Sequence, residues 1–267
     1  MASRAVEAFL LSREWRDRPD GVEIVLWGRA AEGPVCARIP AQEAVMFVPR
    51  HVTTSAGRRR PRPLRSLAGE PVDAVYFRSQ RALVEERDRL RSVLGVALES
   101  DVKPADRYLM ERFVTASFRL EGEAVERRGV LWFDSPRVKA AELRPELSLL
   151  ALDLETDGWD GPLLSAAIAT RGREKVIVRA PRPVSGQGPG PGSGAPGVIL
   201  VPDERALLTA LFAEIAAIDP DVVCGWNVVA FDLAVLEARC RASGVPFALG
   251  RAGELARVMP AATAQQV

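Results

Sequence analysis

Histidine and cysteine are scarce in this chain of 267 residues. It has one histidine, His51, and three cysteines, Cys36, Cys224 and Cys240, which are widely spaced and form no CxxC pair. A zinc site built from histidine and cysteine, or a catalytic triad that relies on histidine, is therefore excluded by inventory. An odd number of scattered cysteines predicts no disulfide framework, which fits the reducing cytoplasm.

Net charge is also small, because 36 basic residues almost balance 35 acidic ones. Such a chain has no global positive field, so any contact with nucleic acid must be local. The start of the chain lacks a signal-peptide pattern, and no apolar run reaches the roughly 20 residues of a membrane helix. We expect a cytoplasmic protein associated with the nucleoid and with no membrane contact. The hydrophobic fraction of 48% supports a buried core.

The first half of the chain reads as a mixed α+β domain, which we place at residues 1–146. Alternating apolar residues and turn residues predict strands and two helices, the second of them capped by Asp106. The expected strands are 9–16, 22–29, 35–39, 44–48, 72–77 and a strand region at 118–136, and the expected helices are 79–94 and 106–113.

A basic, proline-rich segment interrupts this domain. Residues 54–66 read TTSAGRRRPRPLR, and we expect a loop there. Runs of arginine and proline are stable in water without a partner, so a solvated loop is the favoured interpretation. A patch that binds DNA phosphates is the alternative.

The second half, residues 147–267, has the order of an RNase H-like α/β domain. Three strands in series are followed by helix, strand and helix, at 147–154, 163–169, 175–179, 202–217, 222–225 and 231–242. A Pro- and Gly-rich insert at 181–197 has few apolar residues to bury, and we expect a flexible surface loop.

Carboxylates follow two of these strands. Asp153 and Glu155 share one face of the first strand, because side chains alternate. Asp232 lies in the first turn of the last helix, after a buried strand. Clustered carboxylates favour a hard cation such as Mg²⁺ or Mn²⁺. Each also has a structural interpretation, since Asp153 and Glu155 precede turn residues and Asp232 complements a helix dipole.

Four segments resemble the family B DNA polymerases, and in particular the N-terminal part of the bacterial DNA polymerase II type. They are LSREWRD at 11–17, RYLMERF at 107–113, LDLET at 152–156 and DPDVVCGWNVVAFDL at 219–233, the last being the most specific. The resemblance implies an N-terminal domain followed by an RNase H-like 3′→5′ exonuclease domain.

By this resemblance, Asp153, Glu155 and Asp232 are catalytic metal ligands of the first two exonuclease motifs. Asn227, Phe231 and Thr156 are expected to hold a single-stranded 3′ end of DNA. The expected reaction is phosphodiester hydrolysis assisted by two Mg²⁺ or Mn²⁺ ions, in DNA replication and repair.

The family's third exonuclease motif and its polymerase motifs have no match in the chain. We therefore expect an N-terminal fragment that is weakly active or inactive, with any docking to a sliding clamp supplied by a missing C-terminal part. Two other functions stay open, namely a non-catalytic DNA-binding module based on the arginines at 58–65 and a stand-alone exonuclease of the Asp-Glu-Asp-Asp group.

Overall fold

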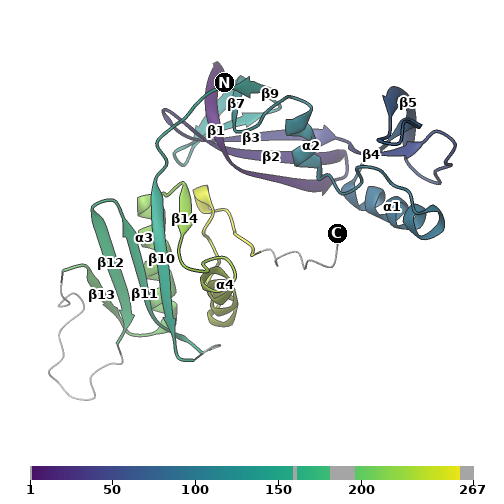
Figure 1. The fold of residues 1–267 in the computed structure, drawn as a ribbon. Helices are drawn as coiled ribbons and strands as arrows, with labels where there is room; N and C mark the ends of the chain where they lie inside the picture. Colours follow the sequence, from purple (N-terminus) through teal and green to yellow (C-terminus); the bar gives the residue numbers. More distant parts are fainter. Residues whose placement is uncertain (1, 159–160, 181–195, 259–267) are drawn as a thin grey trace, which may run out of the picture. The chain divides into compact units, whose positions relative to one another are not determined.

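The computed structural model describes residues 2–158, 161–180 and 196–258, and the chain divides into two compact units (Figure 1). Unit 1 is Met1–Pro145 and unit 2 is Glu146–Val267. The boundary expected between residues 146 and 147 lies beside this division, and the functional identity of the two domains stays a prediction. The mixed α+β and α/β fold classes are confirmed.

Unit 1 is built around a ring of five strands. β1 is long enough to pair with β2 through one half and with β7 through the other. This double pairing closes the order β1-β2-β3-β8-β7 into a ring, so that none of the five is left as a full free edge. β9 adds to the outside of β7. The strands are β1 (Ala2–Arg18), β2 (Gly21–Ala30), β3 (Gly33–Gln42), β7 (Ser117–Arg127), β8 (Val130–Asp134) and β9 (Arg137–Ala141).

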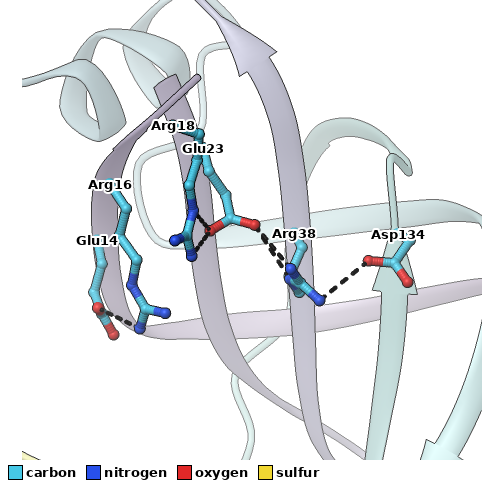
Figure 2. A network of polar contacts seen from close by, with 6 residues as sticks. All are labelled: Glu14, Arg16, Arg18, Glu23, Arg38 and Asp134. Carbon is cyan, nitrogen blue, oxygen red and sulfur yellow. Dashed lines mark hydrogen bonds and ion pairs between the residues drawn. The ribbon is translucent and has the colours of Figure 1, made fainter. Parts of the chain in front are cut away.

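The core of the ring is apolar, and one buried charge beside it is neutralised. Glu23 on β2 is only 5% exposed, and its carboxylate accepts hydrogen bonds from Arg18 and Arg38 (Figure 2). Burial tends to raise the pKa of Glu23, but the two guanidinium groups outweigh it, so the pKa lies below its ordinary value. Arg38 also approaches Asp134 of β8 at 3.9 Å, which links three strands of the ring.

A second, three-stranded sheet in unit 1 has the order β4-β6-β5, and helix α1 packs against it. The elements are β4 (Ala44–Pro49), β5 (Arg58–Arg65), β6 (Pro71–Phe77) and α1 (Gln80–Leu94). The expectation of a loop at 54–66 is wrong for 58–65, because β6 supplies a pairing partner for this arginine-rich segment. Helix α1 begins as predicted, since the Ser79 hydroxyl accepts a hydrogen bond from the Ala82 N–H and caps the helix.

The predicted helix at 106–113 is observed earlier, as α2 (Pro104–Met110). Its N-cap is Lys103, which makes no side-chain cap, and Pro104 occupies the first turn, where a missing N–H costs nothing. The prediction that Asp106 caps the helix is therefore wrong. Asp106 lies inside the first turn and forms an ion pair with Arg13 of β1.

Unit 2 contains a five-stranded sheet with the order β13-β12-β11-β10-β14. The pairings β10–β11 and β11–β12 are antiparallel, as expected for a meander, and β10–β14 and β12–β13 are parallel. β13 was not predicted, and most of the segment expected as a flexible insert, 181–195, lies outside the described residues. The strands are β10 (Leu149–Thr156), β11 (Leu163–Thr170), β12 (Arg173–Arg179), β13 (Val198–Val201) and β14 (Val222–Cys224).

Two helices cover this sheet, and each has clear end signals. In α3 (Glu204–Ile218), the Asp203 side chain accepts from the Ala206 N–H at the start. α4 (Asp232–Ser243) ends at Gly244, which has φ 63°. α3 packs on β11 and β12, and α4 packs on β10, around a core of leucines and isoleucines. No helix in the described ranges is long and apolar enough to span a membrane.

Candidate active site

The candidate site is built on β10, the strand that carries Asp153 and Glu155. In the sheet, β10 lies between β11 and β14. Leu150, Leu152 and Leu154 are 0%, 2% and 5% exposed and enter the core. Asp153 and Glu155 alternate with them on the exposed face, as the side-chain period of a strand requires. The predicted common face of the two carboxylates is therefore observed.

β14 is shorter than β10 and ends before it reaches the level of Asp153. The segment of β10 that carries the acidic residues is therefore not paired with β14. The last residue of β14, Cys224, pairs with Ala151, two residues before Asp153. Gly225 follows, and a Cβ atom at this position would lie 2.4 Å from the backbone oxygen of Leu152. Only glycine allows the chain to leave β14 this close to β10.

The segment after Gly225 is a tight turn that begins helix α4. Asn227 has φ 56°, in the left-handed region that asparagine tolerates better than most residues. The Asn227 carbonyl accepts the Phe231 N–H at 2.9 Å, and the Val228 carbonyl accepts the Leu233 N–H at 2.8 Å. These bonds fix where α4 starts and so where Asp232, its first residue, is placed.

Asp232 is buried, with 2% exposure, and its Oδ1 atom has no hydrogen-bond partner. Burial raises the pKa of the Asp232 carboxyl above its ordinary value, and the nearby Asp153 carboxylate raises it further. Hydrogen bonds from the backbone of Asp232 and Leu154 act in the opposite direction. Asp232 begins α4, and α4 packs on β10, the strand that carries Asp153, so the turn brings the two acidic motifs onto neighbouring elements.

An unpartnered, buried carboxylate oxygen beside a second carboxylate is costly, and a hard divalent cation would neutralise it. Asp153 and Asp232 thus fit a cation. Within the described ranges, however, no group of three or more aspartate, glutamate, histidine or cysteine side chains could hold a metal ion. Glu155 shares the face of Asp153 but does not complete a three-carboxylate group with this pair.

The three residues expected to contact substrate differ in their surroundings. Asn227 is exposed, and Phe231 is half-buried at the start of α4. The Thr156 hydroxyl donates to the Gly158 carbonyl at 2.6 Å and therefore takes part in the turn after β10. A β-bulge between Glu155 and Thr156 marks the end of regular pairing with β11.

A second acidic pair nearby, Asp219 and Asp221, has a structural role. Asp221 accepts hydrogen bonds from the Ser148 N–H and hydroxyl and from Arg251, and Asp219 accepts from Arg251 at 2.7 Å. Burial tends to raise the pKa of Asp221, but these bonds outweigh it, so the pKa lies below its ordinary value. The pair ties α3 and β14 to the start of β10.

Two residues of this region were not singled out from the sequence. Gly225 is needed for the close approach of β14 to β10, and a glycine at the end of a short apolar run was the available signal. Trp226 is 94% exposed beside Asn227. A large aromatic side chain left in water next to a candidate site is a candidate surface for stacking on a base.

Two family models match the chain. Residues 8–43 match "DNA polymerase II, N-terminal", and residues 187–261 match "DNA polymerase family B, exonuclease domain". The second match includes Asn227, Phe231 and Asp232, whereas Asp153 and Glu155 precede it.

Similar proteins cover most of the chain. DNA polymerase II of Escherichia coli is 33% identical over 258 residues, which is 92% of this chain and 32% of that protein. A DNA polymerase of Thermococcus kodakarensis is 27% identical over 76% of this chain and 11% of that protein. The structure of the family B DNA polymerase of Pyrobaculum calidifontis aligns with a TM-score of 0.71 and 20% identity, over 94% of this chain and 34% of that one.

The chain spans about a third of the length of the Escherichia coli relative. The fold likeness extends over both units, since it covers 94% of the chain, and the two family models match one segment in each unit. The chain therefore belongs to the family B DNA polymerases, with an N-terminal segment of the DNA polymerase II type and a segment of the family's exonuclease domain.

Proposed function

We propose that unit 2 is the 3′→5′ exonuclease unit of a DNA polymerase of the DNA polymerase II type, with DNA as its substrate. The observation that carries the proposal is the buried Asp232 carboxylate, whose Oδ1 atom is unpartnered and which interacts with Asp153. Hydrolysis of a mispaired 3′ end during replication or repair would require such an acidic site, and would place the protein with the chromosome.

Asp153 and Asp232 would hold a divalent metal ion, with Mg²⁺ and Mn²⁺ as the candidates, and Glu155 would join them from the same face of β10. A bound metal of this kind supplies a water of lowered pKa and stabilises charge on the leaving oxygen. The family comparison supports this use of divalent metal.

The residues of the chain itself have binding and positioning roles in this proposal. Asn227 and Trp226, both exposed on the turn before α4, would contact the sugar and base of a single-stranded 3′ end. Phe231 would support the turn, and Thr156 would hold the loop after β10 through its bond to Gly158. The buried end of α4 keeps the Asp232 carboxylate oriented before substrate binds.

We further propose that this chain, by itself, hydrolyses single-stranded DNA slowly or not at all. Two close carboxylates with one more on the same strand face offer fewer ligands than a two-metal centre requires. Contacts with a sliding clamp are proposed for the whole polymerase only.

The first test measures metal binding through stability, so that it does not depend on turnover. Titration of the metal-free protein with Mn²⁺ should raise its melting temperature, because a ligand that binds only the folded state stabilises it. Asp153→Ala and Asp232→Asn should abolish the shift. Asp157→Asn, an exposed carboxylate in the following turn, is the matched control and should keep it.

A second measurement follows degradation of a 5′-labelled single strand with Mg²⁺ or with EDTA. We expect slow, EDTA-sensitive loss from the 3′ end, or none above background. An Mn²⁺ shift that survives in both Asp153→Ala and Asp232→Asn would refute the metal site. Rapid hydrolysis abolished by Asp153→Ala would refute only the proposed weakness of this chain.

A further inference from the structure

The second sheet of unit 1 carries a concentration of positive charge that the exonuclease proposal does not use. Residues 50–65 contain six arginines and no acidic residue, in a chain whose net charge is +1. Five of these arginines lie in β5, the edge strand of the order β4-β6-β5. We call Arg58, Arg60 and Arg62 the arginine strip. Arg65 is not included, because its pairing with Pro71 places it on the other face of the sheet and its guanidinium donates to the Gly69 carbonyl at 2.7 Å.

Two of the six arginines pair with a buried carboxylate of unit 1. Arg50 and Arg59 both donate to the Asp73 carboxylate, which is 4% exposed, at 3.1 Å and 2.9 Å. Burial tends to raise the pKa of Asp73, but the two arginines outweigh it, so the pKa lies below its ordinary value. Arg50 and Arg59 therefore serve the fold and are separate from the arginine strip.

Most of the strip has no carboxylate to neutralise it. Arg58 pairs with Glu43 at 2.6 Å. Arg60 and Arg62 make no ion pair with any residue in the described part of the chain, and both are exposed. Exposed guanidinium groups without a carboxylate partner are suited to phosphates, which they bind in a bidentate manner.

An aromatic residue holds part of the strip in a fixed orientation. Arg58 and Tyr76 are paired across β5 and β6, and the Arg58 guanidinium lies 4.9 Å from the centre of the Tyr76 ring. Arg62 donates to the Tyr76 hydroxyl at 2.7 Å, and its guanidinium lies 5.8 Å from the same ring. Arginines held this way lose less freedom on binding a ligand.

The outer edge of β5 argues against a peptide as the ligand. Pro61 and Pro63 lie within the strand and lack the N–H groups that an added strand would need. Alternate side chains on a strand lie about 6.7 Å apart, which is comparable with the spacing of phosphates along an extended single strand. Pairing registers place Arg58 and Arg60 on one face of the sheet, opposite Tyr76 and Ala74.

We propose that the arginine strip binds the phosphate backbone of single-stranded DNA, independently of the acidic pair in unit 2. The strip is short and offers no base-reading groups of its own, so binding should be tolerant of sequence. It should also depend on salt, because each neutralised phosphate releases counterions.

The test uses the whole chain in EDTA with a fluorescein-labelled oligodeoxythymidylate of about 16 nucleotides, the upper range of one binding unit, and follows anisotropy. Arg60→Ala/Arg62→Ala should weaken binding about tenfold near 0.1 M salt. The slope of log K against log salt should become shallower by about 1.4, for two lost contacts on a single strand. Arg60→Lys/Arg62→Lys keeps the charge and should restore most of the slope.

The control is Arg81→Ala/Arg137→Ala, which removes two exposed arginines from α1 and β9 of the same unit. It should leave affinity within about twofold. Equal loss in the control, or unchanged affinity in Arg60→Ala/Arg62→Ala, would overturn the proposal. Equal binding of a duplex of the same length would overturn the assignment to single strands. Because affinity is measured in EDTA and metal binding by the Mn²⁺ titration, failure of the strip is distinguishable from failure of the metal site.

Discussion

Gly225, near Asp153 and Asp232, has no room for a side chain. Its hydrogen points at the Leu152 carbonyl, and a Cβ there would approach that oxygen to 2.4 Å. Gly225→Ala must push β14 away from β10, and overpacking of this kind costs about 1–3 kcal/mol of unfolding free energy. Urea titration followed by circular dichroism measures the loss.

Cys224→Ala, at the exposed neighbouring position, controls for the substitution itself and should change stability by less than about 0.5 kcal/mol. The Mn²⁺ shift proposed above should weaken in Gly225→Ala, because α4 and Asp232 follow Gly225 directly. A Gly225→Ala protein as stable as the original would show that the strand can move without strain.

Glu86 gives unit 1 a defined dependence on acid. The carboxylate is 3% exposed and accepts hydrogen bonds from Arg89 and from the Ser55 N–H and hydroxyl. The Arg89 bond is the main cause that lowers the pKa of Glu86 from 4.5 to about 2, against the effect of burial. Since the folded pKa is the lower one, the stabilisation is present above pH 4.5 and is lost as pH falls toward 2.

We therefore expect Glu86→Gln to lower stability at pH 6 by about 2 kcal/mol or less. This is below the full equivalent of the pKa difference, because Arg89 is 40% exposed and water screens the pair. The deficit should shrink between pH 4.5 and pH 2.5 in urea titrations. Glu85→Gln, on the exposed side of the same helix, should show no comparable deficit, and a pH-independent deficit in Glu86→Gln would contradict the assignment.

At the scale of elements, local patterns predicted the elements that carry their own signals. The alternation in β10 predicted which side chains enter the core, and Ser79 and Gly244 predicted helix ends. β5 was missed because its stability comes from β6, a partner later in the chain, whereas its own arginines and prolines disfavour a strand. The closure of β1 on β7 is likewise set by pairing between distant segments.

For the candidate site too, local patterns predicted part of the arrangement, and contacts between distant segments set the rest. The sequence placed Asp153, Glu155 and Asp232 at strand ends and at a helix start, which the structure bears out. It could not predict that Asp232 would be buried with an unpartnered oxygen, or that Glu155 would stand apart from a three-residue group. Those properties depend on where β14 ends and on how tightly the turn at Gly225 passes β10.

Two adjacent residues of β5 have different roles, one in the stability of unit 1 and the other in the proposed binding of DNA. Arg59 points to the buried Asp73 and is 27% exposed, whereas Arg60 is exposed and unpaired within the described ranges. Arg59→Ala should destabilise unit 1 by about 2 kcal/mol, less than for a fully buried pair because Arg50 still contacts Asp73. Arg60→Ala should stay within about 0.5 kcal/mol in the same urea titrations. A large loss of stability in Arg60→Ala would mean that the arginine strip also serves the fold.

At the scale of the whole molecule, the residues that the structure describes form two separate apolar cores, one in each unit. A unit with its own core can unfold as its own cooperative transition. The variants above divide between these cores, since Arg59→Ala and Glu86→Gln belong to unit 1 and Gly225→Ala belongs to unit 2.

We expect calorimetry to resolve two transitions and each variant to shift only the transition of its own unit, because each substituted residue belongs to one unit with its own core. Mn²⁺ should shift only the transition lowered by Gly225→Ala, since the proposed metal ligands all lie in unit 2. A single transition that moves in every variant would show that the units unfold together. In that case the metal-dependent shift would have to be assigned by hydrogen exchange at the N–H groups of β10 and α4.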